Sequence, residues 1–87
     1  MSVLEDLIAT RNRFESVRGN TSIQSAHYGA CHSSETSLAS LVALREALPP
    51  GFADFKQFET DRCWSRKKAM EVLDRAVVRA LKTGSRS

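Results

Sequence analysis

The sequence is poor in cysteine and in long apolar runs, and each of these shortages excludes a class of protein. Cys31 and Cys63 are the only cysteines among 87 residues, too few for a disulfide scaffold and without the CxxC spacing of redox motifs. No apolar run approaches the roughly 20 residues that span a bilayer. The start, MSVLEDLIATRNR, lacks the basic and then apolar pattern of a secretory signal. We therefore expect a cytoplasmic protein with free thiols and no contact with a membrane.

The rest of the composition is that of a folded domain with unevenly distributed charge. Hydrophobic residues make up 41% and charged residues 26% of the chain, close to globular averages, and the length predicts a single domain over residues 1–87. The net charge is +3, but residues 1–60 carry five Lys and Arg against seven Asp and Glu, whereas residues 61–87 carry eight against three. The basic character lies at the C-terminal end, where residues 84–87 are predicted to form a flexible basic tail.

The first apolar pattern predicts a helix over about residues 3–18. Ser2 and Glu5 have the spacing of a capping box, and Gly19 supplies a stop. The apolar residues between them follow helical spacing: Leu4, Leu7, Ile8, Phe14 and Val17.

A second helix is predicted over about residues 21–48, where the sequence LPPG ends it. At roughly 100° per residue, Ile23 and Ala30 project to the same side as Leu41 and Leu48, which favours one long helix. Gly29 weakens a helix by about 1 kcal/mol relative to alanine, so a break around 29–34 is the alternative. Small residues populate the first half of the inner side and would let a neighbouring helix approach closely: Ala26, Ala30, Ser34 and Ser37.

A third helix is predicted over about residues 52–83, with a break near 60–65 as the alternative. In an unbroken helix, Glu59, Arg62 and Arg66 would interrupt the apolar face and Trp64 would point away from it. The apolar face itself comprises Phe55, Ala69, Leu73, Ala76, Val77 and Ala80. The expected fold class is therefore all-α, a small antiparallel three-helix bundle.

The stretch AHYGACHSSE at 26–35 contains the side chains that most suggest chemistry. On a continuous helix, His27, Cys31 and Glu35 would share a face, and His32 would point beyond it. However, His27 and Cys31 also fall in the apolar sector, where a thiol and an imidazole are ordinary packing residues. No standard zinc spacing is completed, and no residue is evident that would orient a Cys–His nucleophilic pair. We predict no metal, no cofactor and no catalytic residue here.

The alternatives at Trp64 lead to different functions. If the helix breaks near 60–65, Trp64 can turn back into the core and carries no function. If the helix is unbroken, Trp64 is exposed together with Arg62, Arg66 and Lys67. Because Trp and Arg are enriched at binding hot spots, these four residues are the predicted partner-binding site.

A basic stripe is predicted on the outer face of the last helix. Its members are Lys68, Arg75, Arg79 and Lys82, and Arg86 in the tail could extend it. Such a stripe could follow a phosphate backbone. A solvated helix face, with a Glu71–Arg75 pair and cations that complement the helix dipole, is the simpler interpretation. No helix-turn-helix or zinc-finger pattern accompanies it.

Two further arginines, Arg11 and Arg45, project near the apolar faces of their helices. Long arginine stems commonly lie along the edge of a core with the charge in water. The alternative is a polar layer that includes Glu59 and Arg62, or contact with carboxylates of a partner.

These patterns favour a non-enzymatic interaction module, such as an adaptor, an inhibitor or an assembly subunit. Three short helices rarely enclose the few hundred Å³ that a small-molecule substrate needs. The expected partner is therefore another protein or a second copy of the chain. The alternative function is a nucleic-acid-binding accessory protein that uses the basic stripe.

Overall fold

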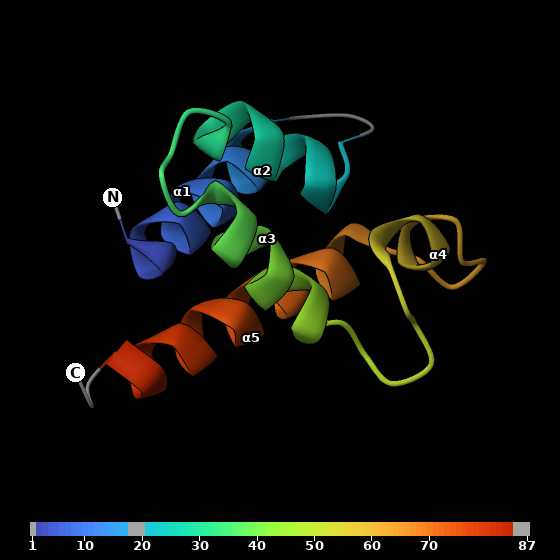
Figure 1. The fold of residues 1–87 in the computed structure, drawn as a ribbon. Coiled ribbons are helices and arrows are strands. Elements are labelled where there is room, and N and C mark those ends of the chain that lie inside the picture. The colour runs from blue at the N-terminus through green and yellow to red at the C-terminus, as the bar shows by residue number, and fades with distance from the viewer. Residues whose placement is uncertain (1, 18–20, 85–87) are drawn as a thin grey trace.

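The computed structural model, which describes residues 2–17 and 21–84, confirms the all-α class but has five helices. Figure 1 shows how these helices are arranged in space. Within these two ranges there is no β-strand. The helices are α1 (Val3–Ser16), α2 (Ile23–Cys31), α3 (Ser37–Glu46), α4 (Phe55–Glu59) and α5 (Arg66–Gly84). Two of the three long helices expected from the sequence are thus each divided in two.

The predicted capping box at the start of α1 is confirmed. The backbone N–H of Glu5 donates to Ser2 Oγ at 3.2 Å, and Ser2 N–H donates to Glu5 Oε1 at 3.0 Å. The helix ends at Ser16, slightly before the predicted residue 18. The predicted stop, Gly19, lies outside the described residues.

The prediction of one helix over 21–48 is wrong, because residues 32–36 form turns between α2 and α3. The Ser34 hydroxyl donates to both oxygens of the Asp6 carboxylate, at 2.9 and 3.0 Å, and Thr36 Oγ1 donates to Oδ2 at 2.6 Å. A buried carboxylate on α1 therefore holds these turns in place. The apolar residues at 23–48 follow helical spacing throughout, but this spacing did not mean that the helix is continuous.

The break near 60–65 is confirmed and divides the third predicted helix into α4 and α5. Asp54 caps α4 by accepting a hydrogen bond from Gln57 N–H at 2.8 Å, and Ser65 Oγ accepts one from Lys68 N–H at 3.2 Å at the start of α5. Thr60 and Asp61 lie in the connection between the two helices.

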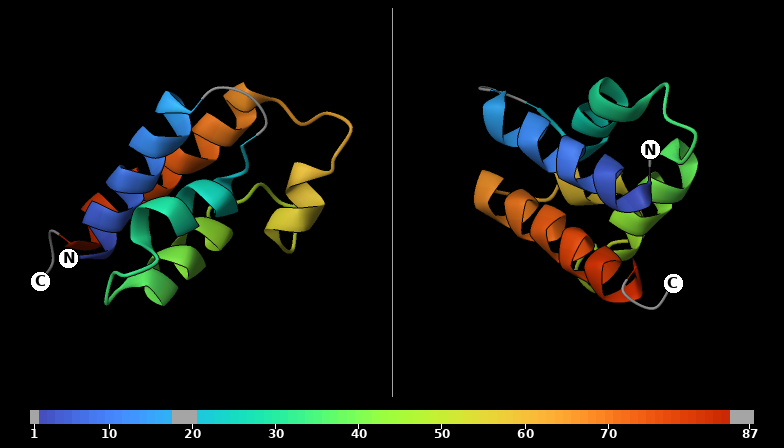
Figure 2. Two further views of the ribbon diagram at one scale, coloured as in Figure 1. Left: turned by 90° about the horizontal axis from the view of Figure 1, so that it is seen from above. Right: turned by 90° about the vertical axis from the view of Figure 1, so that its left-hand side faces the viewer.

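Helices α1 and α5 lie side by side and antiparallel (Figure 2), α2 packs against α1, and α3 contacts both α1 and α5. The short helix α4 lies beyond the N-terminal end of α5 (Figure 1). The core contains the predicted apolar face of α5 together with residues from every other helix: Leu7, Phe14, Ile23, Ala26, Leu44, Phe55, Phe58, Ala69, Val72, Leu73 and Ala76. No helix in the described ranges is both long and apolar enough to cross a membrane.

The two arginines near apolar faces have different surroundings. Arg11 forms an ion pair with Asp74 of α5 and another with Glu15, at 3.2 Å. Arg45 is exposed. Glu59 does not join them in a polar layer, since its carboxylate accepts a hydrogen bond from Ile23 N–H at 2.9 Å, at the start of α2.

Candidate functional site

The segment between α3 and α5 lines a hollow with aromatic walls. Pro49 and Pro50 prevent α3 from continuing, and Gly51 has φ of +97°, a conformation that L-residues with a side chain rarely adopt. The chain then turns into α4, where Ala53 N–H donates to Gln57 Oε1 at 2.8 Å. Phe52 is thereby brought against Phe58, edge to face, with 5.3 Å between the ring centroids.

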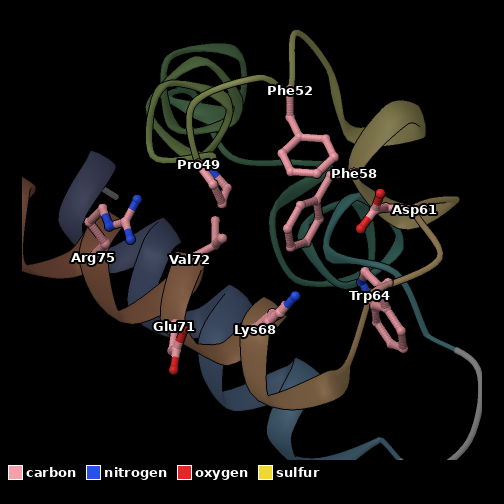
Figure 3. A pocket seen from close by; sticks show the side chains of 9 residues that line it. All are labelled: Pro49, Phe52, Phe58, Asp61, Trp64, Lys68, Glu71, Val72 and Arg75. Atoms are coloured by element: carbon pink, nitrogen blue, oxygen red, sulfur yellow. The ribbon is translucent and has the colours of Figure 1, made fainter.

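These two rings border a cavity of about 310 Å³ between α4 and α5, which we call the Trp64 pocket (Figure 3). Its lining comes from the α3–α4 connection, α4, the α4–α5 connection and α5. The lining residues are Pro49, Phe52, Phe58, Asp61, Trp64, Lys68, Glu71, Val72 and Arg75. The cavity therefore combines an aromatic and aliphatic wall with both cationic and anionic side chains.

Trp64 is partly buried, packs against the hydrophobic core and also lines the cavity. Its Nε1–H is buried without a hydrogen bond of normal geometry to any described residue. The Glu59 carboxyl lies close enough to the Trp64 indole for the indole to affect its pKa. Burial raises the pKa of Glu59, and interactions with Ile23 N–H and the Trp64 indole only partly offset that effect. The indole N–H is thus buried beside the Glu59 carboxyl.

The charged residues that line the cavity differ in whether they already form hydrogen bonds within the protein. Arg75 Nη1 donates to the carbonyl oxygen of Ala47 at 3.1 Å, and an Asp61 carboxylate oxygen accepts from Cys63 N–H at 3.1 Å. Figure 3 shows Glu71 pointing away from the two phenylalanine rings. Lys68 is exposed, and its side chain forms no hydrogen bond or ion pair with the residues that the structure describes. Lys68 is therefore the cation most available to a ligand in the cavity.

The predicted partner-binding residues do not form one patch. Arg62 and Lys67 are exposed, whereas Trp64 lines the cavity. Arg66 turns toward α1, where its Nη2 donates to the carbonyl oxygens of Phe14, Glu15 and Val17 at 2.7, 3.0 and 2.9 Å. Its guanidinium carbon also lies 5.0 Å from the centroid of the Phe14 ring. Arg66 thus stabilises the C-terminal end of α1.

The residues of the predicted basic stripe also have different surroundings. Arg79 Nη1 donates to the carbonyl oxygen of Glu46 at 2.9 Å, so that Arg75 and Arg79 both bind the C-terminal end of α3. Lys68 lines the Trp64 pocket and Lys82 is exposed on α5. Arg86 lies outside the described residues, as does the rest of the predicted tail after Gly84.

A buried polar cluster around Asp6 was missed by the sequence analysis. Asp6, Thr10 and Ser40 have no exposed surface, and His27 is 4% exposed. Besides its bonds to the turn at 32–36, the backbone of Asp6 accepts hydrogen bonds from Thr10 Oγ1 at 2.8 Å and Cys31 Sγ at 3.3 Å. The only signal in the sequence was an acidic residue next to Leu7 on the apolar side of the first helix.

Hydrogen bonds also fix the state of His27. The Ser40 hydroxyl donates its single proton to the carbonyl oxygen of Ser37 at 2.9 Å, so His27 Nε2, at 2.7 Å from Ser40 Oγ, acts as the donor. Burial lowers the pKa of His27, against opposing effects of the Asp6 carboxylate and the Ser37 carbonyl. Burial likewise raises the pKa of the Cys31 thiol. A neutral buried imidazole and a protonated buried thiol are packing groups, not an accessible nucleophile.

At the Asp6 carboxyl, hydrogen bonds and a nearby histidine affect the pKa more than burial does. Burial raises the pKa of Asp6, but hydrogen bonds from Thr36 and Ser34, the nearby Ser40 hydroxyl and the proximity of His27 outweigh that effect and lower the pKa overall. Glu35 is exposed. Within the described ranges no group of three or more His, Cys, Asp or Glu side chains could hold a metal ion.

Comparisons of the chain with protein-family models, with curated proteins and with solved structures find no match.

Proposed function

We propose that the protein is a non-enzymatic interaction module that binds a protein partner through the Trp64 pocket. The observation that carries this proposal is the cavity bordered by Phe52, Phe58 and Trp64, with the exposed Lys68 at its edge. An anchoring side chain of the partner would pack against the aromatic wall, and an oxygen acceptor beside it would bind Lys68.

A non-enzymatic role is supported by the separation between the cavity and the buried polar cluster around Asp6. Asp6, His27 and Cys31 belong to the buried cluster between α1, α2 and α3, and none of them lines the Trp64 pocket. The two free thiols, Cys31 and Cys63, fit the cytoplasmic location that we propose for the module.

Nucleic-acid binding is the weaker proposal, because Arg75 and Arg79 bind backbone carbonyl oxygens of α3. Phosphate contacts by these residues would have to share donors with the end of that helix.

Affinity capture with paired variants tests the Trp64 pocket. Immobilised wild-type protein is compared with Lys68→Glu, which reverses a charge in the cavity, and with Lys67→Glu, which makes the same change outside it. Partners captured from an extract of the source cells are identified by mass spectrometry, and their affinity is measured with purified components. We expect Lys68→Glu to weaken binding about tenfold or more, corresponding to about 1.4 kcal/mol, and Lys67→Glu to have little effect.

Three outcomes would contradict the proposal. Equal losses in both variants would indicate general charge attraction, and no loss in either would place the interface elsewhere. Capture that is abolished by nuclease, and that weakens steeply as salt rises, would support the nucleic-acid alternative. Emission of Trp64, the only tryptophan, verifies that each variant remains folded.

A further inference from the structure

A second apolar surface lies on α3, and no other described helix covers it. Leu38, Leu41, Val42 and Arg45 are spaced i, i+3, i+4 and i+7, so they form one face of about two helical turns. Leu38 is 75% exposed, the largest value among the exposed large hydrophobic residues of the described chain. Leu41 is partly buried and packs against the core, so the face is a continuation of the packed interior.

This face forms the floor of a groove of about 280 Å³, separate from the Trp64 pocket. The other lining residues are Gln24 of α2 and Asp54, Phe55 and Lys56 at the start of α4. No residue lines both cavities. We call this second cavity the α3 groove.

Two cations, Arg45 and Lys56, and one carboxylate, Asp54, line the α3 groove, so its lining has a net charge of +1. Arg45 and Lys56 are exposed, and neither side chain has a hydrogen-bond or ion-pair partner within the described part of the chain. The single carboxylate of the groove, Asp54, already accepts the N-cap hydrogen bond from Gln57. An apolar ligand with carboxylates at its flank would therefore be complementary to the groove.

From this geometry we infer that the α3 groove binds an acidic amphipathic helix of a partner protein. A straight ridge with i, i+3, i+4 and i+7 spacing is the surface against which the apolar face of another helix packs. Asp or Glu residues beside that apolar face would bind Arg45 and Lys56. The inference is independent of the Trp64 pocket, since it rests on other residues.

The test begins with a displayed library of random 16-residue peptides. The library is selected for binding to the full chain and depleted of binders to Leu38→Asp. We expect enriched peptides to carry apolar residues at i, i+3 or i+4 and i+7, and to have a net negative charge. Enrichment of basic peptides, or of sequences without helical spacing, would overturn the inference.

An enriched peptide labelled with fluorescein is then titrated by anisotropy. We expect Leu38→Asp to weaken binding at least tenfold and Arg45→Glu and Lys56→Glu to weaken it severalfold each. Leu81→Asp is the matched control, because Leu81 is also exposed, at 52%, but lies on α5 outside the groove. An equal effect of Leu81→Asp, or no effect of Leu38→Asp, would overturn the inference.

Two additional measurements separate this site from other interpretations. Lys68→Glu should leave binding of the acidic peptide unchanged; a loss would show that the peptide occupies the Trp64 pocket instead. Light scattering of the full chain should show that Leu38→Asp does not alter its oligomeric state. A wild-type dimer that becomes monomeric in Leu38→Asp would mean that a second copy covers the groove, and the inferred partner would be wrong.

Discussion

At the scale of single residues, Asp6 connects α1 to the turns between α2 and α3. Its carboxylate is fully buried and accepts hydrogen bonds from Ser34 and Thr36, two residues of the turns between α2 and α3. A buried carboxylate without such donors would be strongly destabilising. These hydroxyl groups therefore stabilise the ionised form of Asp6, and Asp6 fixes the position of the turns.

We expect Asp6→Asn to lower the free energy of unfolding by about 2 kcal/mol. The amide has the shape of the carboxylate but accepts hydrogen bonds more weakly and adds two donors that the buried site does not need. Urea denaturation followed by circular dichroism measures the effect. Asp74→Asn, which removes an exposed ion-pair partner of Arg11, is the control and should be nearly neutral. Equal stability of Asp6→Asn and wild type would show that the carboxylate does not organise the turns.

His27 predicts a pH dependence of stability. Its pKa is lowered in the folded protein, so as the pH falls through about 6.5 the unfolded chain takes up a proton that the folded chain binds less readily. The free energy of unfolding should consequently decrease on acidification from about pH 7.5 to about 5.5. Glu59, whose pKa is raised, contributes a slope of opposite sign.

The contribution of His27 is isolated by comparing variants over this pH range. The slope of unfolding free energy against pH should be reduced in His27→Gln and retained in His32→Gln, which changes the exposed histidine. Glu59 is present in both variants, so its slope cancels in the comparison. A slope that is unchanged in His27→Gln would contradict the assignment of a neutral buried imidazole.

At the scale of helices, the ends are stabilised by side chains from other helices. Arg66 of α5 binds the C-terminal carbonyls of α1, Arg75 and Arg79 bind those of α3, and Glu59 binds the first N–H of α2. Each contact satisfies a backbone group that the helix itself cannot pair. Residues that the sequence analysis assigned to binding surfaces thus also connect helix ends.

Arg66→Ala should destabilise the fold by about 2 kcal/mol, because three carbonyl oxygens lose a charged donor. Lys67→Ala, the adjacent exposed cation, should leave the midpoint of urea denaturation unchanged within error. Arg66→Lys should recover only part of the loss, since a lysine lacks the planar fork of donors. A neutral Arg66→Ala would return Arg66 to the predicted partner-binding surface.

At the scale of the whole molecule, Trp64 reports whether the α4 region unfolds with the bundle. Trp64 packs against the core that includes residues of α1, α2, α3 and α5. We therefore expect one cooperative transition in urea, with the same midpoint by tryptophan emission and by circular dichroism at 222 nm. The slope should be about 1 kcal/mol/M, as for other small proteins. An earlier transition by emission would show that residues 49–65 open separately from the other helices.

Much of the candidate site could be located in the sequence, but its shape could not. The LPPG terminator, the three phenylalanines at 52, 55 and 58, and the conflict of pattern at Trp64 all indicated an irregular region there. The orientation of the Trp64 side chain depends on the start of α5 directly after Ser65 and on the packing of α4. Neither is encoded in local periodicity, because the deciding contacts join segments distant in the chain.

The sequence by itself determined the all-α class, the capping box at Ser2 and Glu5 and the apolar face of α5, since these depend on neighbours within about two helical turns. Only the tertiary structure decided that α2 and α3 are separate helices. An apolar phase can continue through a short turn, and the residues that hold this turn bind a carboxylate 28 and 30 positions earlier in the chain. Hydrogen bonds across such a separation form only once the helices have packed.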